Sequence, residues 1–320
     1  MMLYSGRVNP SLAEAIAARL GLQLGPVELR TFSDSEVYCR LGESVRGADV
    51  FLIQPTCGNP EAGLSTNDAL MELLVMVDAA VGASAHRVIA VSPWFGYSRQ
   101  DKKSAPREPI SARLVARLLE AAGVDRVLTM DLHTGQMQGF FSVPVDHMTA
   151  MTMLCRHVAD LELGGSLVVV APDAGRAKLN KKFADVIGAG LAILAPGHRG
   201  DGEAESTELV GDVTGKTAII VDDIIDTAET LRVGGETLAQ AGAARVYAAA
   251  THGIFSGDAF ENLAAAPFEQ VVVTDTIPLR VGAPDNVRVL SCDILLSDSI
   301  RRIFIDESVS EVFDGRNLAF

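Results

Sequence analysis

The stretch AIIVDDIIDTAETL, Ala218 to Leu231, runs from apolar residues straight into two adjacent aspartates. The apolar run is typical of a buried β-strand, and burying an ionised carboxylate is costly. A short polar turn, residues 226–230, follows the strand and leads into a predicted helix. Carboxylates at the end of a buried strand therefore indicate a functional edge of the predicted sheet.

The whole chain repeats this alternation of apolar runs and helical segments. Short apolar runs such as ADVFLIQP (48–55), RVLTMDLH (126–133) and SLVVVAPD (166–173) are separated by segments with helical spacing. Strands that alternate with helices of about 10 to 15 residues predict parallel sheets built from βαβ units. The predicted fold class is therefore α/β. The pattern begins again after Val145, so we place a domain boundary near residues 144–150.

Composition and charge exclude several classes of protein. The chain has 320 residues, 48% of them hydrophobic and 21% charged, which is a globular composition. The net charge of −14 argues against nucleic acid as a partner. No apolar run approaches the roughly 20 residues of a membrane span, and we find no secretory signal. The cysteines, which we expect to be reduced in the cytoplasm, are widely spaced: Cys39, Cys57, Cys155 and Cys292.

The residues that follow the apolar runs are the candidate site residues, because ligands in open α/β sheets bind beyond the carboxyl ends of the strands. Several of them are charged or able to ligate a metal: residues 93–100, Asp131, His133, Asp173, Asp222 and Asp223. This placement is the first indication of an enzyme.

The turn after the aspartate pair suits an anionic ligand. Backbone N–H groups at a helix N-terminus form an anion site, and Thr227 and Thr230 add hydroxyl groups. Carboxylates beside such a site fit a phosphorylated ribose, which carries vicinal hydroxyls and a phosphate. A side-chain-capped helix after an ordinary strand would give the same pattern, so both interpretations stay open at this point.

Longer segments carry a resemblance to a known family. IIVDDIIDTAET (219–230) resembles the ribose-phosphate loop of type I phosphoribosyltransferase folds. PWFGYSRQDKK (93–103), DLHTGQMQGFF (131–141) and APDAGRAKLNKKFAD (171–185) are together similar to ribose-phosphate diphosphokinases, the phosphoribosyl pyrophosphate (PRPP) synthetases. The resemblance extends from about residue 4 to about residue 313.

The resemblance implies two phosphoribosyltransferase-like domains, each a mainly parallel sheet flanked by helices. Residues 1–146 would carry the ATP side and the assembly contacts, and residues 147–320 would carry the ribose 5-phosphate loop and a mobile lid. The implied reaction joins ATP and ribose 5-phosphate: the ribose 1-hydroxyl attacks the β-phosphorus of ATP, giving PRPP and AMP. The implied cofactor is Mg²⁺, which bridges phosphates in such transfers. The implied assembly is a homo-oligomer, typically a hexamer in this family.

The resemblance assigns several residues to ATP. Arg99 and Gln100, in YSRQDKK, would hold the nucleotide, and arginine suits this role as a planar donor fork. Phe32 would stack on the adenine of a neighbouring subunit, with Asp34 and Glu36 accepting hydrogen bonds from its amino group. A core aromatic is the alternative interpretation of Phe32.

Two residues are the implied metal ligands. His133 in DLHTGQ would lie by the triphosphate and ligate Mg²⁺, supported by Asp131, and Asp173 in APDAG would be a second metal or ribose ligand. An imidazole is an unusual ligand for Mg²⁺. From the residues alone, a core histidine and a helix N-cap carboxylate are the alternatives for His133 and Asp173.

Ribose 5-phosphate is assigned to the aspartate pair and to the turn, mostly through backbone groups of the turn: Asp222, Asp223, Asp226, Thr227, Ala228, Glu229 and Thr230. Glu229 stands where the family turn carries glycine. Because backbone amides bind the phosphate, we expect this binding to survive. A milder departure is Arg176, which stands where the family's PDxGG segment ends in glycine.

The serious departure lies in the lid, APGHRGDGEAESTELVG (195–211). The family carries a lysine there, and an arginine two places on, that stabilise the transition state. Here these positions fall on Pro196 and His198, so His198 and Arg199 are the candidate catalytic replacements. Loss of preorganised positive charge usually costs about 10²–10³-fold per group.

Two hypotheses follow from this lid. The chain is an active synthetase that uses His198 and Arg199, or it is a weakly active or inactive paralogue that binds nucleotide and sugar phosphate and regulates a catalytic partner. We favour the active enzyme, because the other site residues are retained. A phosphoribosyltransferase that consumes PRPP is disfavoured, because it needs only one such domain and would not explain SRQDKK or DLHTGQ.

Overall fold

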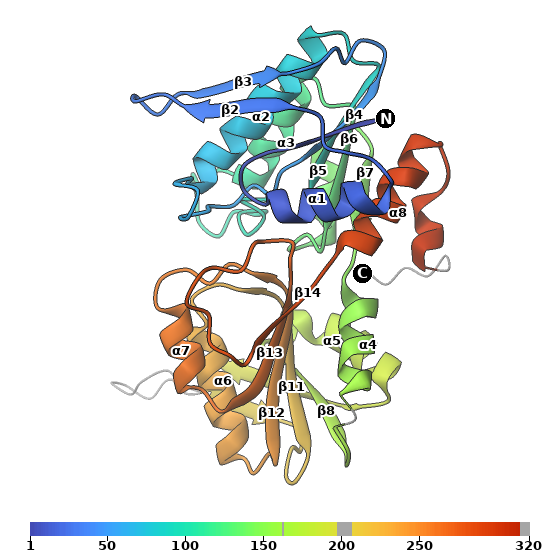
Figure 1. Cartoon of the computed structure of the whole chain (residues 1–320). Coiled ribbons are helices and arrows are strands. Elements are labelled where there is room, and N and C mark those ends of the chain that lie inside the picture. Colours follow the sequence, from blue (N-terminus) through green and yellow to red (C-terminus); the bar gives the residue numbers. More distant parts are fainter. Residues whose placement is uncertain (162, 197–206, 314–320) are drawn as a thin grey trace. The chain divides into compact units, whose positions relative to one another are not determined.

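The computed structural model describes residues 1–161, 163–196 and 207–313, so the candidate catalytic residues His198 and Arg199 lie outside the described residues. The chain forms two compact units (Figure 1). The first contains Met1–Thr149, Thr276–Pro278 and the chain from Ser291 onward; the second contains Ala150–Asp275 and Leu279–Leu290.

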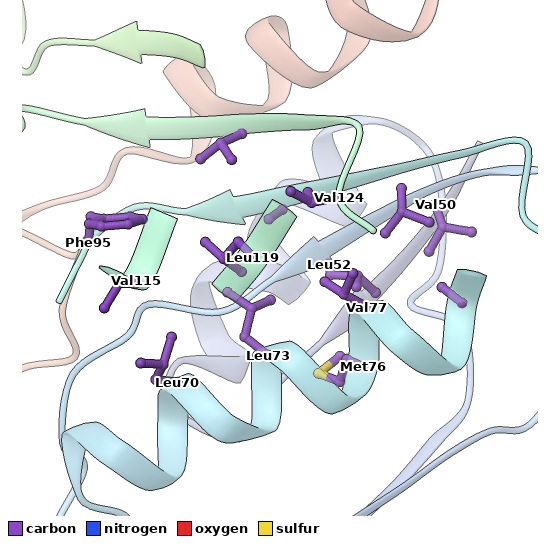
Figure 2. Packing of buried hydrophobic residues seen from close by; sticks show 14 of the residues in the cluster. Val50, Leu52, Leu70, Leu73, Met76, Val77, Phe95, Val115, Leu119 and Val124 are labelled. Atoms are coloured by element: carbon purple, nitrogen blue, oxygen red, sulfur yellow. The ribbon is translucent and has the colours of Figure 1, made fainter. Parts of the chain in front are cut away.

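The first unit is built on a parallel five-stranded sheet in the order β1-β4-β5-β6-β7. These strands are β1 (Met2–Ser5), β4 (Asp49–Ile53), β5 (Arg87–Ser92), β6 (Arg126–Met130) and β7 (Val145–Met148). The helices before the end of β7 are α1 (Pro10–Arg19), α2 (Thr66–Gly82), α3 (Ser111–Ala122) and the short η1 (Gly135–Phe140). Figure 2 shows how Leu73 and Val77 of α2 pack beside Leu52 of β4 and Leu119 of α3.

A hairpin of β2 (Val27–Thr31) and β3 (Val37–Leu41) forms a separate antiparallel sheet. In Figure 1 its tip extends away from the five-stranded sheet of the same unit. The tip, residues 32–36, is therefore presented to the surroundings of this unit and does not contribute to its core.

The C-terminal helix α8 (Asp293–Phe304) packs on α1 of the first unit, and η3 (Val309–Phe313) follows it. The Arg87 guanidinium, at the start of β5, binds Asp49 at 2.5 Å and Asp306 at 2.6 Å. The sequence assigned residues 147–320 to the second domain, whereas the structure groups the chain from Ser291 onward with the first unit. Helical periodicity shows that a helix has an apolar face but not which sheet that face covers.

The second unit is built on a seven-stranded sheet in the order β10-β9-β8-β11-β12-β13-β14, in which only the β9–β10 pair is antiparallel. Its strands are β8 (Leu167–Ala171), β9 (Gly190–Pro196), β10 (Thr207–Val210), β11 (Thr217–Ile225), β12 (Arg245–Gly253), β13 (Phe268–Thr274) and β14 (Val287–Leu290). Figure 1 shows two helix pairs on opposite sides of this sheet: α4 (Met151–Asp160) with α5 (Ala177–Ile187), and α6 (Glu229–Gln240) with α7 (Ala259–Ala265).

The strand order creates a switch point beside β8. The chain leaves β8 toward β9 on one side, and it leaves β11 toward β12 on the other. Ligands of open α/β sheets bind at such a point, outside the carboxyl ends of the strands. Pairing between β8 and β11 ends at Val170 opposite Ile220, while β11 continues to Ile225. The continuation carries the two aspartates of the opening stretch.

Helix α6, which begins at the predicted phosphate turn, approaches the sheet closely through glycine. A Cβ atom added to Gly235 would lie 2.8 Å from Cζ of Phe268 in β13, and the Phe268 side chain is buried. This close approach holds the helix, and with it the turn at its N-terminus, against the sheet.

We expect Gly235→Ala to lower the free energy of unfolding by about 1–3 kcal/mol, because an overpacked side chain must displace the Phe268 ring. Urea denaturation followed by circular dichroism measures this change. The control is Gly82→Ala at the end of α2, where an added Cβ meets nothing within 4 Å. That variant should be unchanged or up to about 1 kcal/mol more stable. If both variants had the same stability, the close approach of α6 would not contribute to folding.

Candidate active site

The aspartate pair lies on the part of β11 that extends beyond β8. Asp223 is buried, with 5% of its side chain exposed, whereas the Asp222 side chain keeps 29% of its surface exposed. The Asp223 N–H donates to Asp222 Oδ1 at 2.8 Å. The two carboxylates therefore occupy different environments: one is held inside the protein and the other reaches the surface of this unit.

The turn after β11 has the geometry of an anion site. Ala228 is the N-cap residue of α6, its φ is 57°, and no side chain caps this helix. Thr227, Glu229 and Thr230 are exposed. A left-handed conformation is unfavourable for a residue other than glycine and is often retained at functional sites. The alternative interpretation, a capped helix after an ordinary strand, finds no side-chain cap at this N-terminus.

The turn is held in place from the β12 side of the sheet. The Ser256 N–H donates to the Asp226 carbonyl at 3.1 Å, and the Ser256 hydroxyl donates to the Asp226 carboxylate. The Asn262 side chain donates to the Thr227 carbonyl at 2.9 Å. Asp226 and Thr227 are therefore fixed by contacts that leave the N-terminus of α6 without a side-chain cap.

Glu229, which stands in place of the family's glycine, is the first residue of α6 and is exposed. Its backbone is helical, so this position does not require the conformational freedom of glycine. The departure found in the sequence therefore leaves the backbone of the turn intact.

The loop after β8 brings a cation to the aspartate pair. Asp173 is exposed, and its Oδ1 accepts a hydrogen bond from the Arg176 N–H at 3.0 Å, so it caps the short helix η2 (Ala174–Arg176). The Arg176 guanidinium lies 2.6 Å from Asp223 Oδ2 and 3.5 Å from Asp222 Oδ1. In the sequence, Arg176 stands out only as a departure from the family's glycine. Its role depends on the order of β8 and β11 in the sheet, which the sequence does not state.

Burial and the neighbouring carboxylate of Asp223 raise the pKa of Asp222 well above its usual value, and the positive charge of Arg176 opposes this rise. Two carboxylates in contact resist ionising together, because the charge on one disfavours the charge on the other. Arg176 is the cation that the structure bonds to both.

In the first unit, the candidate ATP residues lie on the loops after β5 and β6. Arg99 and Gln100 are exposed. Gln100 also has a structural role, because its Oε1 accepts from the Ser111 hydroxyl at 2.7 Å and its carbonyl accepts from the Ala112 N–H at 3.2 Å. These contacts fix the loop after β5 to the start of α3.

His133 lies on the loop after β6 and is half-buried, so the structure does not place it in the core. The N–H of Leu132 donates to His147 Nε2 at 2.8 Å, which fixes the backbone just before His133. The Thr134 hydroxyl donates to Asp101 Oδ2 at 2.5 Å. The Thr134–Asp101 bond joins the loops after β5 and β6, which carry Arg99 and His133.

Phe32 lies at the tip of the hairpin and is 43% exposed, which excludes a core aromatic within this unit. The Arg30 guanidinium lies 5.0 Å from the centre of the Phe32 ring and 4.4 Å from that of Tyr38. Asp34 and Glu36 are also exposed at the tip. The tip therefore presents an aromatic face with carboxylates beside it.

Within the described parts of the chain, no group of three or more His, Cys, Asp or Glu side chains could hold a metal ion by itself. Proteins usually hold Mg²⁺ through one or two groups together with substrate phosphates. His133 and Asp173 are each accessible enough to supply one such group. Of the helices described, none is long and apolar enough to cross a membrane.

The sheet of the second unit, its carboxylate pair and its uncapped helix N-terminus define a class, the α/β enzymes with a phosphoribosyltransferase-like fold. Comparison with known proteins narrows this class to a family. The model for the N-terminal domain of ribose phosphate pyrophosphokinase matches residues 1–123, and the model for the phosphoribosyl synthetase-associated domain matches residues 202–314.

The relatives agree over the full length of the chain. A ribose-phosphate pyrophosphokinase of Caldanaerobacter subterraneus is 47% identical over 98% of both chains. One from Spinacia oleracea is 46% identical over 98% of this chain and 92% of its own. The crystal structure of the phosphoribosylpyrophosphate synthetase of Mycobacterium smegmatis matches with a TM-score of 0.89 at 41% identity, covering 95% of this chain and 99% of that one.

This chain therefore belongs to the ribose-phosphate pyrophosphokinase family. The predicted family, the α/β fold of two mainly parallel sheets and the enzyme class are confirmed. The roles assigned to individual site residues stay predictions.

We expect Asp222→Asn to raise the melting temperature at pH 7. The pKa of Asp222 in the folded protein lies above its ordinary value of 3.8. Such a carboxyl destabilises the fold progressively as pH rises from its ordinary pKa to its raised pKa, because the folded state resists its ionisation. The amide removes this charge but keeps an oxygen for the Asp223 N–H. Scanning calorimetry at several pH values from about 4 to about 8 measures the change in melting temperature, because carboxyls with a raised pKa titrate in about this range.

The control for this variant is Asp212→Asn, in an exposed pair with Lys216 that lowers the pKa of Asp212 to about 2. The shift has the opposite sign, so its removal should not raise the melting temperature. If Asp222→Asn melted at or below the wild-type temperature at pH 7, the assignment of charge repulsion to this pair would be wrong.

Proposed function

We propose that this chain transfers the pyrophosphoryl group of Mg-ATP to the 1-hydroxyl of ribose 5-phosphate, forming PRPP and AMP. The observation that carries the proposal is the pairing of Asp222 and Asp223 with the uncapped N-terminus of α6. The relatives are named ribose-phosphate pyrophosphokinases and match this chain over nearly their full length, which supports the same reaction.

The second unit would bind and orient the sugar. The carboxylates of Asp222 and Asp223 accept hydrogen bonds from the ribose hydroxyls, and the backbone N–H groups of residues 227–230 donate to the 5-phosphate. Binding both ends of the sugar fixes the direction of its 1-hydroxyl, and such orientation is a main source of rate in transfers of this kind. The anchored backbone of Asp226 and Thr227 supports this role.

The first unit would bind the nucleotide. Arg99 can bind phosphate oxygens through two parallel N–H donors, which lysine cannot do. Gln100 both holds its own loop and faces the nucleotide. His133 would supply a ligand to Mg²⁺, which when bound neutralises phosphate charge. In the second unit, Asp173 would be a second metal ligand or a ribose ligand.

The lid would supply the remaining positive charge. We assign this role to His198 and Arg199, which stand near the positions of the family's lysine and arginine. Arg199 is charged at any physiological pH, whereas His198 is charged only when protonated. Their substitution should therefore lower the turnover and change the substrate affinity less.

The hairpin would complete the nucleotide site of a neighbouring copy. Phe32 would stack on adenine while Asp34 and Glu36 accept from the amino group of the base. An exposed aromatic tip with carboxylates beside it supports this role. The assembly we propose is a homo-oligomer, a hexamer as is typical of the family. We place it in the cytoplasm, where its four unpaired cysteines fit a reducing compartment.

We expect the purified chain, given ATP and Mg²⁺, to release AMP only when ribose 5-phosphate is present, with PRPP formed in equal amount. Chromatography of the nucleotides measures AMP. Omission of ribose 5-phosphate and chelation of Mg²⁺ with EDTA are the controls, and both should abolish the reaction. No AMP under saturating conditions would contradict the proposed function.

The lid can be examined in the same assay. His198→Ala and Arg199→Ala should each lower kcat by about 10²–10³-fold if they replace the family's catalytic cations. If the chain is active and both variants keep its kcat, other residues supply the catalytic positive charge. An inactive chain that still binds ATP and ribose 5-phosphate would favour the regulatory paralogue.

We expect Phe32→Ala to raise the KM for ATP by about 10-fold, because stacking of an aromatic side chain on one base contributes about 1–3 kcal/mol of binding free energy. If the hairpin serves a neighbouring copy, hetero-oligomers of Phe32→Ala and Asp222→Asn chains contain sites with both features intact. Co-expression with two affinity tags, followed by assay at low ATP, should then recover activity above that of either variant alone. Recovery no greater than the sum of the two would place hairpin and site on the same chain.

A further inference from the structure

We infer that Arg176 is a positioning residue for ribose, holding Asp222 and Asp223 in an orientation in which both accept hydrogen bonds from the sugar hydroxyls. The inference rests on the proposed function of the aspartate pair and adds to it a residue outside the predicted site. It is carried by geometry within the second unit alone.

The register of the sheet explains why one side chain can reach both aspartates. Adjacent residues of a strand point to opposite faces, so neighbours on β11 would ordinarily face different partners. Pairing with β8 ends at Ile220, and the loop that follows β8 lies beside the continuation of β11. A guanidinium that enters from this edge can contact the carboxylates on both faces.

The backbone of Arg176 is fixed, so its side chain starts from a defined point. Its N–H donates to Asp173 Oδ1 at 3.0 Å, and its carbonyl accepts from the side chain of Asn180 at 3.1 Å. Asn180 is fully buried. The Arg176 side chain is only 17% exposed. Arg176 is therefore preorganised beside the aspartate pair, unlike a flexible arginine on the surface.

Hydrogen bonds and ion pairs hold both carboxylates in one orientation. Asp222 Oδ1 faces two donors, the Asp223 N–H at 2.8 Å and the Arg176 Nε at 3.5 Å. Asp223 Oδ2 faces Arg176 Nη2 at 2.6 Å. Without the cation, two adjacent carboxylates repel each other, and neither is held in this orientation.

The test is the binding of ribose 5-phosphate to Arg176→Met, measured by titration calorimetry without ATP. We expect the Kd to rise by about 10-fold or more, as for the loss of a hydrogen bond to a charged group. In the AMP assay the KM for ribose 5-phosphate should rise likewise, while kcat and the KM for ATP change by less than about threefold. Arg176→Lys, which keeps the charge, should recover part of the affinity.

The matched control is Lys181→Met on α5, which removes the same charge from an exposed pair with Asp185. Its Kd and KM should equal those of wild type. If Arg176→Met does not fold, Arg176→Lys and Arg176→Gln carry the test, and glutamine should bind more weakly than lysine.

Three outcomes would overturn the inference: an unchanged Kd in Arg176→Met, a loss confined to kcat, or an equal loss in Arg176→Met and the Lys181→Met control. Failure of the proposed function is a separate result. Wild-type protein would then release no AMP, whereas failure of this inference leaves wild-type AMP release intact.

Discussion

Hydrogen bonding between β8 and β11 stops at Val170 and Ile220, and the arrangement of Asp222, Asp223 and Arg176 depends on where it stops. The continuation of β11 carries the aspartate pair past the end of its neighbour, and the loop after β8 occupies the side that becomes available. A slip of one residue would exchange the faces of the two carboxylates and move Arg176 away from both. The strand register and the geometry of the aspartate pair are thus set by the same interaction.

A chain with a net charge of −14 must gather positive charge locally to bind two phosphorylated substrates. In the site that we propose, the second unit does so with backbone dipoles and an arginine: the uncapped N-terminus of α6 would face the 5-phosphate, and Arg176 faces the carboxylates. Backbone dipoles add positive potential without adding a side chain that would pair with the aspartates. The phosphate end and the hydroxyl end of the sugar can therefore lie a few residues apart on the chain.

The sequence was sufficient for whatever depends on local pattern. The alternation of elements and the strand ends that carry Asp222 and His133 agree with the structure. The sequence was insufficient for contacts that depend on which strands and helices are neighbours in space. The partner of Arg176 depends on which strand lies beside β8, and the second role of Gln100 depends on the distance to α3. The return of α8 to the first unit leaves no periodic signal in the chain.

That return of α8 has a consequence for how the protein is made. Ribosomes deliver the chain from its N-terminus, and domains generally fold as units as they emerge. The first unit contains α1, which is made early, and α8, which packs on α1 and is made near the end. The second unit, apart from its link through Thr276–Pro278, is complete at Leu290. The first unit is therefore completed only after the second, and until α8 has been made the face of α1 that receives it stays open to chaperones.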